Sequence, residues 1–377
     1  MGERADRYRK KGYTVFGGGT FVERLEHDRL FGQEVFKEHG IPTPETWEVH
    51  DLAGVDAVLK SEFGKAEKLV IKLDGADMAG SSFSFVAKNP EMCHEQVMHW
   101  IDEGMLPGKW TGIIQRFVEG IEASCAGWWN GEEFSTIVLD LEEKKPFPGE
   151  LGPAVGCAYN TLVRLDTSSK LYKQVLEPLG PLLKKHGYIG EIDTNSIIDA
   201  SGKPHALEFT PRLGYDSTPT FAWGNNHGFF NKIFAILGMG DAPEFGYQGR
   251  VWAGVRVAIP PYPCESPDEK ASAAFYESVA KNVPFLNYED LADDFYPYDL
   301  KKTDEGKYVC TGAIATLGVA MGAGDDPLAA SKAAYKVAER VQAPNKIFRA
   351  LDGPRRAQKA LEELLAMKLI RLYPELP

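Results

Sequence analysis

The sequence lacks the motifs that identify several common enzyme classes. Its five cysteines are widely spread with no C-x-x-C pair, so neither a disulfide framework nor a cysteine-based zinc site is expected. Its eight histidines form no H-E-x-x-H spacing, and no G-x-S-x-G stretch is present. A zinc protease and a nucleophile-elbow hydrolase are therefore not indicated.

The chain also lacks long apolar runs and an excess of positive charge. No apolar stretch reaches the length of about 18 residues that spans a membrane, and residues 1–17 contain no signal-peptide core. The formal net charge of −12 argues against nucleic acid or a membrane surface as the main partner. We expect a cytoplasmic soluble protein.

The predicted helices and strands are mixed along the chain. Residues 21–40 have apolar residues near helical spacing, and Gly40 with Pro42 beyond it predicts the end of a helix. Residues 111–143 are typical of strands, with Asn130-Gly131 as a hairpin turn. Gly17-Gly18-Gly19 does not match G-x-G-x-x-G and predicts a turn. Without strict βαβ alternation, 377 residues predict an α+β enzyme of two or three domains.

The most informative stretch is GYIGEIDTNSIIDASGKPHALEFTPRLGYDST, residues 187–218. Two apolar runs flank a turn signal at residues 199–202, which predicts a β-hairpin. Alternation then places polar side chains on one face of each strand, namely Glu191, Asp193 and Asn195 on the first strand and Glu208, Thr210 and Arg212 on the second.

Asn195 and Glu208 are 13 positions apart across this hairpin, so their oxygens can meet at a shared hard cation. Mg²⁺ prefers oxygen ligands and is commonly held by one or two carboxylates together with substrate phosphates. Arg212 could bind a phosphate or a carboxylate through two parallel hydrogen bonds. The alternative is a solvated sheet face, because Arg and Glu are common on exposed strands.

Two further segments carry polar groups beside apolar strands. Lys72 lies within LVIKLDG, and it either extends to solvent or meets an anion, because an unpaired buried ammonium is costly. The following turn contains Gly75, Gly80 and Ser81, whose backbone N–H groups could bind phosphate. Residues 113–124 run from a strand into a polar linker with Glu122, which suits adenine and ribose as well as it suits a plain hairpin.

In this order, the segments resemble the ATP-grasp ligases, and specifically the glycinamide ribonucleotide synthetase (phosphoribosylamine–glycine ligase) family. The resemblance covers about residues 14–360. It is carried by LEHDRLFGQEVFKEHGIPTP, VIKLDGADMAGSSFSFVAK, IIQRFVEGIEAS, KKPFPGELGPAVGCAY and ALEFTPRLGYDST, and by the carboxy-terminal run from GAIATLGVAMGAG to LDGPRRA. It implies an ATP-grasp fold, with two α/β subdomains around a nucleotide cleft and a β-rich α+β carboxy-terminal domain.

The resemblance also implies a mechanism and residue roles. A carboxylate, glycine first, attacks the γ-phosphate of ATP, and an amine then displaces phosphate to leave an amide. The implied cofactors are ATP and Mg²⁺ or Mn²⁺. The implied nucleotide contacts are Arg29, Lys72, Gly75, Gly80, Ser81, Gln115, Arg116, Phe117, Val118 and Glu122. Glu208, Asn195 and Asp193 would bind the metal, Lys72 and Arg212 would act in catalysis, and Lys144, Tyr159, Arg212, Gly214 and Asp216 would contact substrate.

Several positions depart from the family pattern. Ser81 stands where the family has a lysine, and Thr210 replaces its metal-binding asparagine. Tyr215 interrupts F-G-D and leaves Asp216 one place late, while the acids Glu191 and Asp193 stand where the family is apolar and are candidates to supply the lost ligand. The chain enters the pattern only at the end of the family's amino-terminal domain.

These departures leave the acceptor and the pathway open. The expected segments are 1–43 as a residual amino-terminal part, 44–110 and 111–245 as the small and large ATP-grasp subdomains, and 246–377 as the carboxy-terminal domain. The alternatives are a nucleotide-binding module without ligase chemistry, and a ligase that needs a partner chain; a homodimer is also open.

Overall fold

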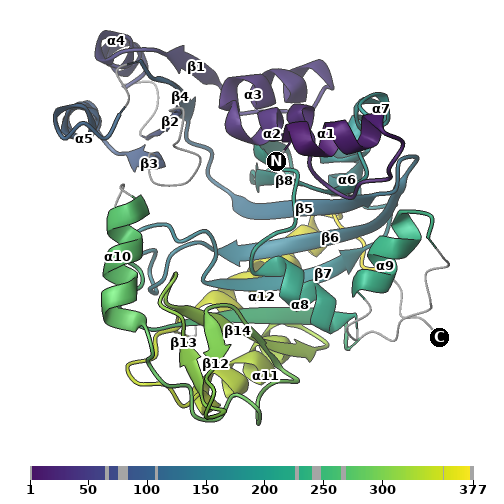
Figure 1. The fold of residues 1–377 in the computed structure, drawn as a ribbon. Coiled ribbons are helices and arrows are strands. Elements are labelled where there is room, and N and C mark those ends of the chain that lie inside the picture. Colours follow the sequence, from purple (N-terminus) through teal and green to yellow (C-terminus); the bar gives the residue numbers. More distant parts are fainter. Residues whose placement is uncertain are drawn as a thin grey trace. The chain divides into compact units, whose positions relative to one another are not determined.

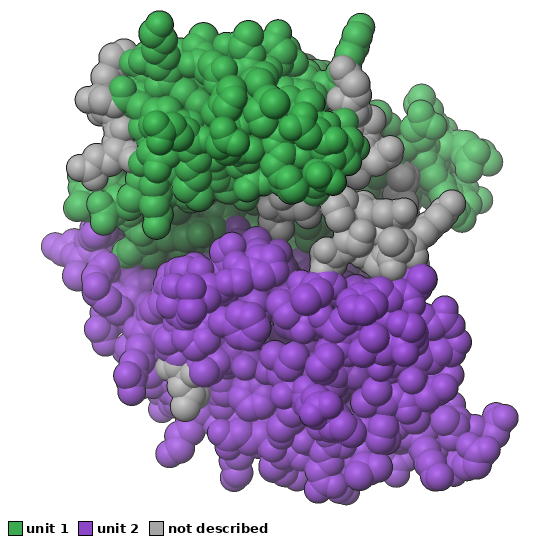
Figure 2. Space-filling view, turned by 90° about the vertical axis from the view of Figure 1, so that its left-hand side faces the viewer, with its two compact units in different colours: residues 1–135, 170–212 green, residues 136–169, 213–377 purple. Residues whose placement is uncertain are grey.

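The computed structural model describes residues 2–63, 68–74, 84–106, 109–225, 229–239, 248–264, 269–350 and 352–373. Two compact units divide the chain, and Figure 2 colours them separately. Unit 1 contains residues 1–135 and 170–212, and unit 2 contains residues 136–169 and 213–377. The four segments expected from the sequence follow the chain in order, whereas each unit is built from two separate stretches.

Three helices begin unit 1: α1 (Gly2–Lys10), α2 (Thr20–His27) and α3 (Arg29–Glu38) (Figure 1). The helix predicted over residues 21–40 is two helices, because Asp28 leaves helical geometry and its carboxylate accepts the Phe31 N–H to begin α3. The predicted turn at Gly17–Gly19 is confirmed, with φ of 69°, 63° and 134°. These left-handed values favour glycine, which has no Cβ to clash.

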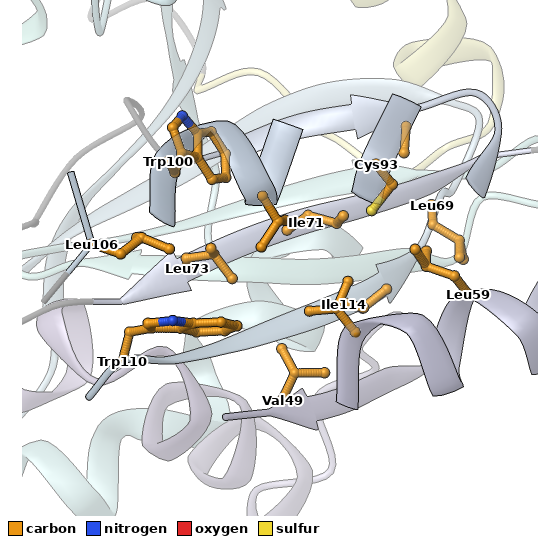
Figure 3. Close-up of a cluster of buried hydrophobic side chains, with 13 residues drawn as sticks. Val49, Leu59, Leu69, Ile71, Leu73, Cys93, Trp100, Leu106, Trp110 and Ile114 are labelled. Carbon is orange, nitrogen blue, oxygen red and sulfur yellow. The ribbon is translucent and has the colours of Figure 1, made fainter. Parts of the chain in front are cut away.

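A four-stranded antiparallel sheet in unit 1 contains β1 (Thr46–Val49), β2 (Leu69–Asp74), β3 (Ser84–Ala87) and β4 (Thr111–Arg116), in the order β1-β4-β2-β3. Leu69, Ile71 and Leu73 alternate along β2 and are fully buried beneath α4 (Leu52–Glu62) and α5 (Pro90–Asp102). Figure 3 shows these side chains in one cluster with Trp100 and Ile114. Strand β4, which begins just after the boundary expected at residue 110, pairs with both β1 and β2 of this sheet.

The rest of unit 1 surrounds the predicted hairpin. Strands β5 (Ile121–Trp129), β8 (Gly190–Ile198) and β9 (Pro204–Thr210) are antiparallel neighbours in that order. Helix α3 packs on β9, where Phe36 stacks on Phe209 at 3.8 Å between ring centroids. The short helices α6 (Lys170–Val175), η2 (Glu177–Leu179) and α7 (Gly180–Lys185) precede β8. The turn predicted at Asn130-Gly131 is confirmed, because the Asn130 side-chain oxygen accepts the Glu132 and Glu133 N–H groups.

Unit 2 is built on antiparallel strands in the order β6-β7-β10-β14-β11. Their bounds are β6 (Phe134–Glu143), β7 (Tyr159–Leu165), β10 (Val251–Ala258), β14 (Thr316–Gly324) and β11 (Phe295–Pro297), with β12 (Leu300–Lys302) and β13 (Tyr308–Cys310) as a separate pair. The helices are α8 (Ser217–Gly224), α9 (Phe229–Ile236), α10 (Glu269–Ala280), α11 (Pro327–Arg340) and α12 (Gly353–Ala366). Helix α11 approaches β14 so closely that a Cβ at Gly322 would lie 2.2 Å from the Ala334 nitrogen.

The expected α+β class is confirmed by these mixed helices and antiparallel sheets. Among the helices of the described ranges, none is both long enough and apolar enough to cross a bilayer.

Candidate functional site

The polar face predicted on the hairpin is present in the strand register. Asn195 on β8 lies directly opposite Glu208 on β9, and Asp193 lies opposite Thr210. Ser124 on β5 lies opposite Asn195 from the other side. Because residues paired across an antiparallel ladder project from the same face, these oxygen-bearing side chains share one surface. The predicted juxtaposition of Asn195 and Glu208 is therefore confirmed.

Asn195 has a buried oxygen that no group among the described residues satisfies. Its side chain is 4% exposed, and its amide N–H donates to the Glu122 carboxylate at 3.3 Å. An ionised carboxylate accepts hydrogen bonds but donates none, so the amide nitrogen of Asn195, and not its oxygen, points toward Glu122. Within the ranges that the structure describes, the amide oxygen has no hydrogen-bond partner, although buried acceptors are normally paired. An orphaned acceptor here fits a ligand that brings a cation or a donor.

Glu208 remains accessible from solvent. Its side chain is 41% exposed, and the Arg29 guanidinium at the start of α3 lies 3.8 Å away. Arg29 is therefore beside the predicted metal ligand, where it could also bind a phosphate oxygen.

The donor set suits a hard cation that also binds phosphate. Across the described part of the chain, no three His, Cys, Asp or Glu side chains form a metal cluster. Glu208 and Asp193 instead provide two carboxylates, with the Asn195 amide oxygen between them in the register. Mg²⁺ is typically held by one or two carboxylates and completed by phosphates and water, so these residues fit it.

Lys72 lies in the small sheet of unit 1. It is buried on the face of β2 opposite Ile71 and Leu73, with Ser84 and Ile113 as its cross-strand neighbours. This position agrees with a lysine beside a ligand-binding surface, while the choice between an anion and a route to solvent stays a prediction. The predicted phosphate-loop residues Gly75, Gly80 and Ser81 lie outside the described residues.

The predicted adenine segment, residues 115–118, contains the last two residues of β4 and the two residues after it. The N–H groups of Arg116 and Phe117 already donate to the carbonyls of Glu45 and Lys68. The Arg116 side chain pairs with Glu45 at 2.8 Å and with Glu62 at 3.0 Å. A backbone donor for an adenine ring would therefore come from Val118.

Arg212 lies after β9 and is paired within unit 1. Its guanidinium contacts Glu26 of α2 at 3.0 Å, and the side chain is exposed. An exposed ion pair of this kind is weak and is easily exchanged for a phosphate or a carboxylate. Its role in catalysis or substrate binding stays a prediction.

Tyr159 does not fit its predicted role as a substrate contact. It is 1% exposed, and its hydroxyl hydrogen bonds to Thr161 and Ser331, both at 2.6 Å. Burial raises the pKa of this phenol to about 12. Tyr159 is part of the interior of unit 2, and the sequence did not indicate this because the strand that carries it was not recognised.

Asp216 also differs from its predicted role, and its partner Arg256 was missed. Asp216 is 3% exposed, and its carboxylate accepts the Arg256 Nε–H at 3.0 Å. Arg256 also donates to the Val155 carbonyl at 2.8 Å, in the segment that begins at Lys144. An arginine within the apolar run of β10 could have signalled a buried counter-ion, because an unpaired buried charge is costly.

The remaining predicted substrate residues lie in the same unit as this ion pair. The Lys144 carbonyl accepts the Val155 N–H at 2.9 Å, and the Gly214 carbonyl accepts the Thr218 N–H at 3.1 Å. Both residues are partly exposed, unlike Asp216.

Comparison with known proteins identifies the family. Residues 27–218 match the family model described as phosphoribosylglycinamide synthetase, ATP-grasp (A) domain. The chain belongs to this family. The resemblance noted in the sequence is thereby confirmed, including the ATP-grasp fold and its class, an ATP-using ligase.

Relatives cover most of the chain. The phosphoribosylamine–glycine ligase of Ralstonia nicotianae is 26% identical over 345 residues, which are 89% of this chain and 77% of that protein. The enzyme of the same name from Leptospira interrogans is 27% identical over 356 residues, covering 89% and 76%. These relatives do not favour a nucleotide-binding module without ligase chemistry.

Solved structures share the fold. The phosphoribosylamine–glycine ligase from Thermotoga maritima superposes with a TM-score of 0.70 at 23% identity, covering 89% of this chain and 81% of that one. The biotin carboxylase domain of the Hydrogenobacter thermophilus 2-oxoglutarate carboxylase, solved with MgADP and bicarbonate, gives a TM-score of 0.58 at 14% identity over 98% and 80%. ATP-grasp enzymes in general bind ATP and Mg²⁺.

Proposed function

We propose that this protein is an ATP-dependent ligase that joins a carboxylate to an amine through an acyl phosphate. The observation that carries the proposal is the Asn195–Glu208 pair, with its orphaned buried amide oxygen, in a chain of the ATP-grasp family. The γ-phosphoryl group of ATP passes to the carboxylate, which releases ADP. The amine then attacks the acyl carbon and phosphate leaves, so an amide, ADP and phosphate are the products.

The hairpin face would hold the metal ion. Glu208, Asn195 and Asp193 are the ligands we assign to Mg²⁺ or Mn²⁺, and the ion supplies charge neutralisation at the phosphates. Glu122 orients the Asn195 amide so that its oxygen stays available. Thr210 offers a hydroxyl oxygen beside Asp193 in place of the family's asparagine.

The remaining unit 1 residues would hold the nucleotide. Lys72 and Arg29 neutralise phosphate charge, which phosphoryl transfer needs more than covalent help from the protein. Val118 donates to adenine, and Glu122 accepts from the ribose hydroxyls. The assignment also retains the sequence-based contacts at Gly75, Gly80, Ser81, Gln115, Arg116 and Phe117.

The substrate side is assigned to Lys144, Gly214 and Arg212. Glycine is the first carboxylate to test, because the relatives are named phosphoribosylamine–glycine ligases. The first amine to test is phosphoribosylamine, followed by other primary amines. We place the protein in the cytoplasm and its subdomain boundaries near residues 43, 116 and 245, with a homodimer or a partner chain as further proposals to be tested by gel filtration.

The test is ADP release from purified protein over a panel of carboxylates and amines. Release that requires both substrates, with a hydroxamate formed when hydroxylamine replaces the amine, supports the ligase. Tight Mg-ATP binding with no ADP release and no hydroxamate over the whole panel would contradict it.

A further inference from the structure

Two segments of unit 2 that the proposed function assigns to substrate are joined by one buried arginine. Residues 144–157 connect β6 to β7 and begin with Lys144. Residues 213–217 comprise the turn before α8 and the first residue of that helix, and they contain Gly214. Arg256, on β10, contacts both segments, although it lies 40 positions from Asp216 and 101 positions from Val155.

The guanidinium of Arg256 donates in two directions. Its Nε–H and Nη2–H groups donate to the Asp216 carboxylate, with the Nε contact at 3.0 Å. Its Nη1–H donates to the Val155 carbonyl at 2.8 Å, and the Arg256 backbone N–H donates to the Ala158 carbonyl at 3.2 Å. The planar fork of an arginine can bridge two such acceptors, whereas the ammonium of lysine acts as a point charge.

The surroundings of this fork are buried. All eight residues of β10 are buried, and the strand is hydrogen-bonded to β7 on one side and to β14 on the other. The Cys157 thiol lies beside the Asp216 carboxylate, and the Tyr262 hydroxyl lies beside Arg256. Burial raises the pKa of Asp216, and the neighbouring Arg256 guanidinium opposes that rise.

The inward position of Asp216 determines which side chain the turn exposes. Tyr215, the preceding residue, is 51% exposed, and its ring lies 5.7 Å from the Arg256 guanidinium. The Tyr298 hydroxyl donates to the Tyr215 carbonyl and holds the turn from the other side. The turn therefore presents Tyr215 and Gly214 outward while its carboxylate serves as the internal anchor.

The other end of the 144–157 segment has its own anchor. Arg349 is 1% exposed and donates to the carbonyls of Lys145 at 2.7 Å and Phe147 at 2.9 Å. It also pairs with Glu143 at 3.0 Å and with Asp352 at 2.8 Å. With this end fixed separately, the Val155 end is related to the 213–217 turn by Arg256, which bridges Val155 and Asp216, and by the Cys157 thiol beside Asp216.

We propose that Arg256 is a positioning residue that fixes residues 144–157 and 213–217 against each other and so shapes the substrate side of the site. It does so through the Val155 carbonyl and the Asp216 carboxylate and touches no substrate itself. The expected effect of Arg256 on catalysis rests on the proposed function. Its expected effect on residues 144–157 rests on the structure alone.

The test compares Arg256→Lys with the wild-type chain. Lysine keeps a positive charge for Asp216 but cannot bridge both acceptors. We expect the KM for the carboxylate or the amine to rise about tenfold, and the KM for ATP to change by less than about twofold, as the loss of one or two hydrogen bonds predicts. Hydrogen exchange of residues 144–157 should quicken. Arg340→Lys, at the exposed end of α11, is the matched control and should change neither quantity.

The outcomes separate the two proposals. Unchanged exchange of residues 144–157 in Arg256→Lys, or an equal rise in the KM for all substrates, overturns the positioning role. If the wild-type chain shows no ligase activity, the proposed function fails. The hydrogen-exchange measurement still decides whether Arg256 positions residues 144–157. Should Arg256→Lys fail to fold, Asp216→Asn/Arg256→Gln removes both charges together and is measured in the same way.

Discussion

Glu208 in unit 1 and Asp216 in unit 2 are both carboxylates beside an arginine, but they differ in exposure. The Glu208 side chain is 41% exposed, with Arg29 at 3.8 Å, while Asp216 is 3% exposed, with Arg256 at 3.0 Å. An accessible carboxylate can exchange a protein partner for a ligand, because both states are solvated. A buried carboxylate cannot, because without its partner it would be a charge that is neither paired nor solvated.

The strand order explains this difference. Glu208 lies on β9, the last strand of the order β5-β8-β9, and its face meets solvent. Arg256 lies on β10, which has strands on both sides and is buried along its length. A charge on an inner buried strand needs an internal counter-ion, and Asp216 provides it. The same residue chemistry is thus a proposed ligand site in one unit and an anchor in the other.

The largest effect is expected from Glu208→Ala. Loss of a metal-binding carboxylate should lower kcat/KM by about 1,000-fold, a typical cost of removing one preorganised electrostatic group. Stability should change little because the side chain is accessible. The measurement is ADP release with glycine and an amine, together with thermal unfolding. Glu339→Ala, on the exposed side of α11, is the control, and wild-type activity in Glu208→Ala would remove the metal assignment.

The second effect is on stability, from Asp216→Ala. This change leaves Arg256 buried without its counter-ion, and we expect the free energy of unfolding to fall by about 3 kcal/mol. The double variant Asp216→Ala/Arg256→Met should recover most of that loss, because it removes the second charge. Urea denaturation measures both. If the single and double variants are equally unstable, the ion pair is not the reason that Asp216 is buried.

A third prediction concerns Lys72, which is buried like Asp216 but is assigned to a ligand like Glu208. Lys72→Met should raise the KM for ATP by about tenfold if the ammonium neutralises phosphate charge, since one charge-assisted hydrogen bond is of that size. Calorimetric binding of Mg-ADP and Mg-ATP checks it, and Lys60→Met on the exposed face of α4 is the control. Equal affinity in the variant and the wild type would favour the route to solvent.

The smallest effect is expected from an exposed carboxylate. Hydrogen bonds from Ser201 and His205 hold the pKa of Asp199 below its ordinary range. A lowered folded-state pKa adds stability above the unfolded pKa of about 4, and this stability is lost as the pH falls below it. Asp199→Asn should therefore lower the melting temperature slightly at pH 7, and the difference should shrink toward pH 2.

Thermal unfolding across that pH range measures the effect. Asp304→Asn, an exposed aspartate in unit 2, controls for the loss of a surface charge. A difference that grows as the pH falls would contradict the sign of the Asp199 shift.

The hairpin shows how far local patterns reach. A turn signal at residues 199–202 and a two-residue alternation were enough to predict that Asn195 and Glu208 face each other, because both strands lie within about twenty residues of sequence. The helix end at Gly40 and the turn at Asn130 were predicted for the same reason. The break at Asp28 was not, because its side chain fits a helix surface and a helix cap equally well.

The sequence by itself determined the hairpin, its polar face, the kinds of element and the family resemblance, since each depends on neighbouring residues. Only the tertiary structure decided that Tyr159 is interior, that Asp216 anchors Arg256 and that Glu208 stays accessible. The physical reason is that burial depends on which distant strands cover a residue. The free energy of ionising a carboxyl group depends more on whether distant strands bury it than on the residues beside it in the chain.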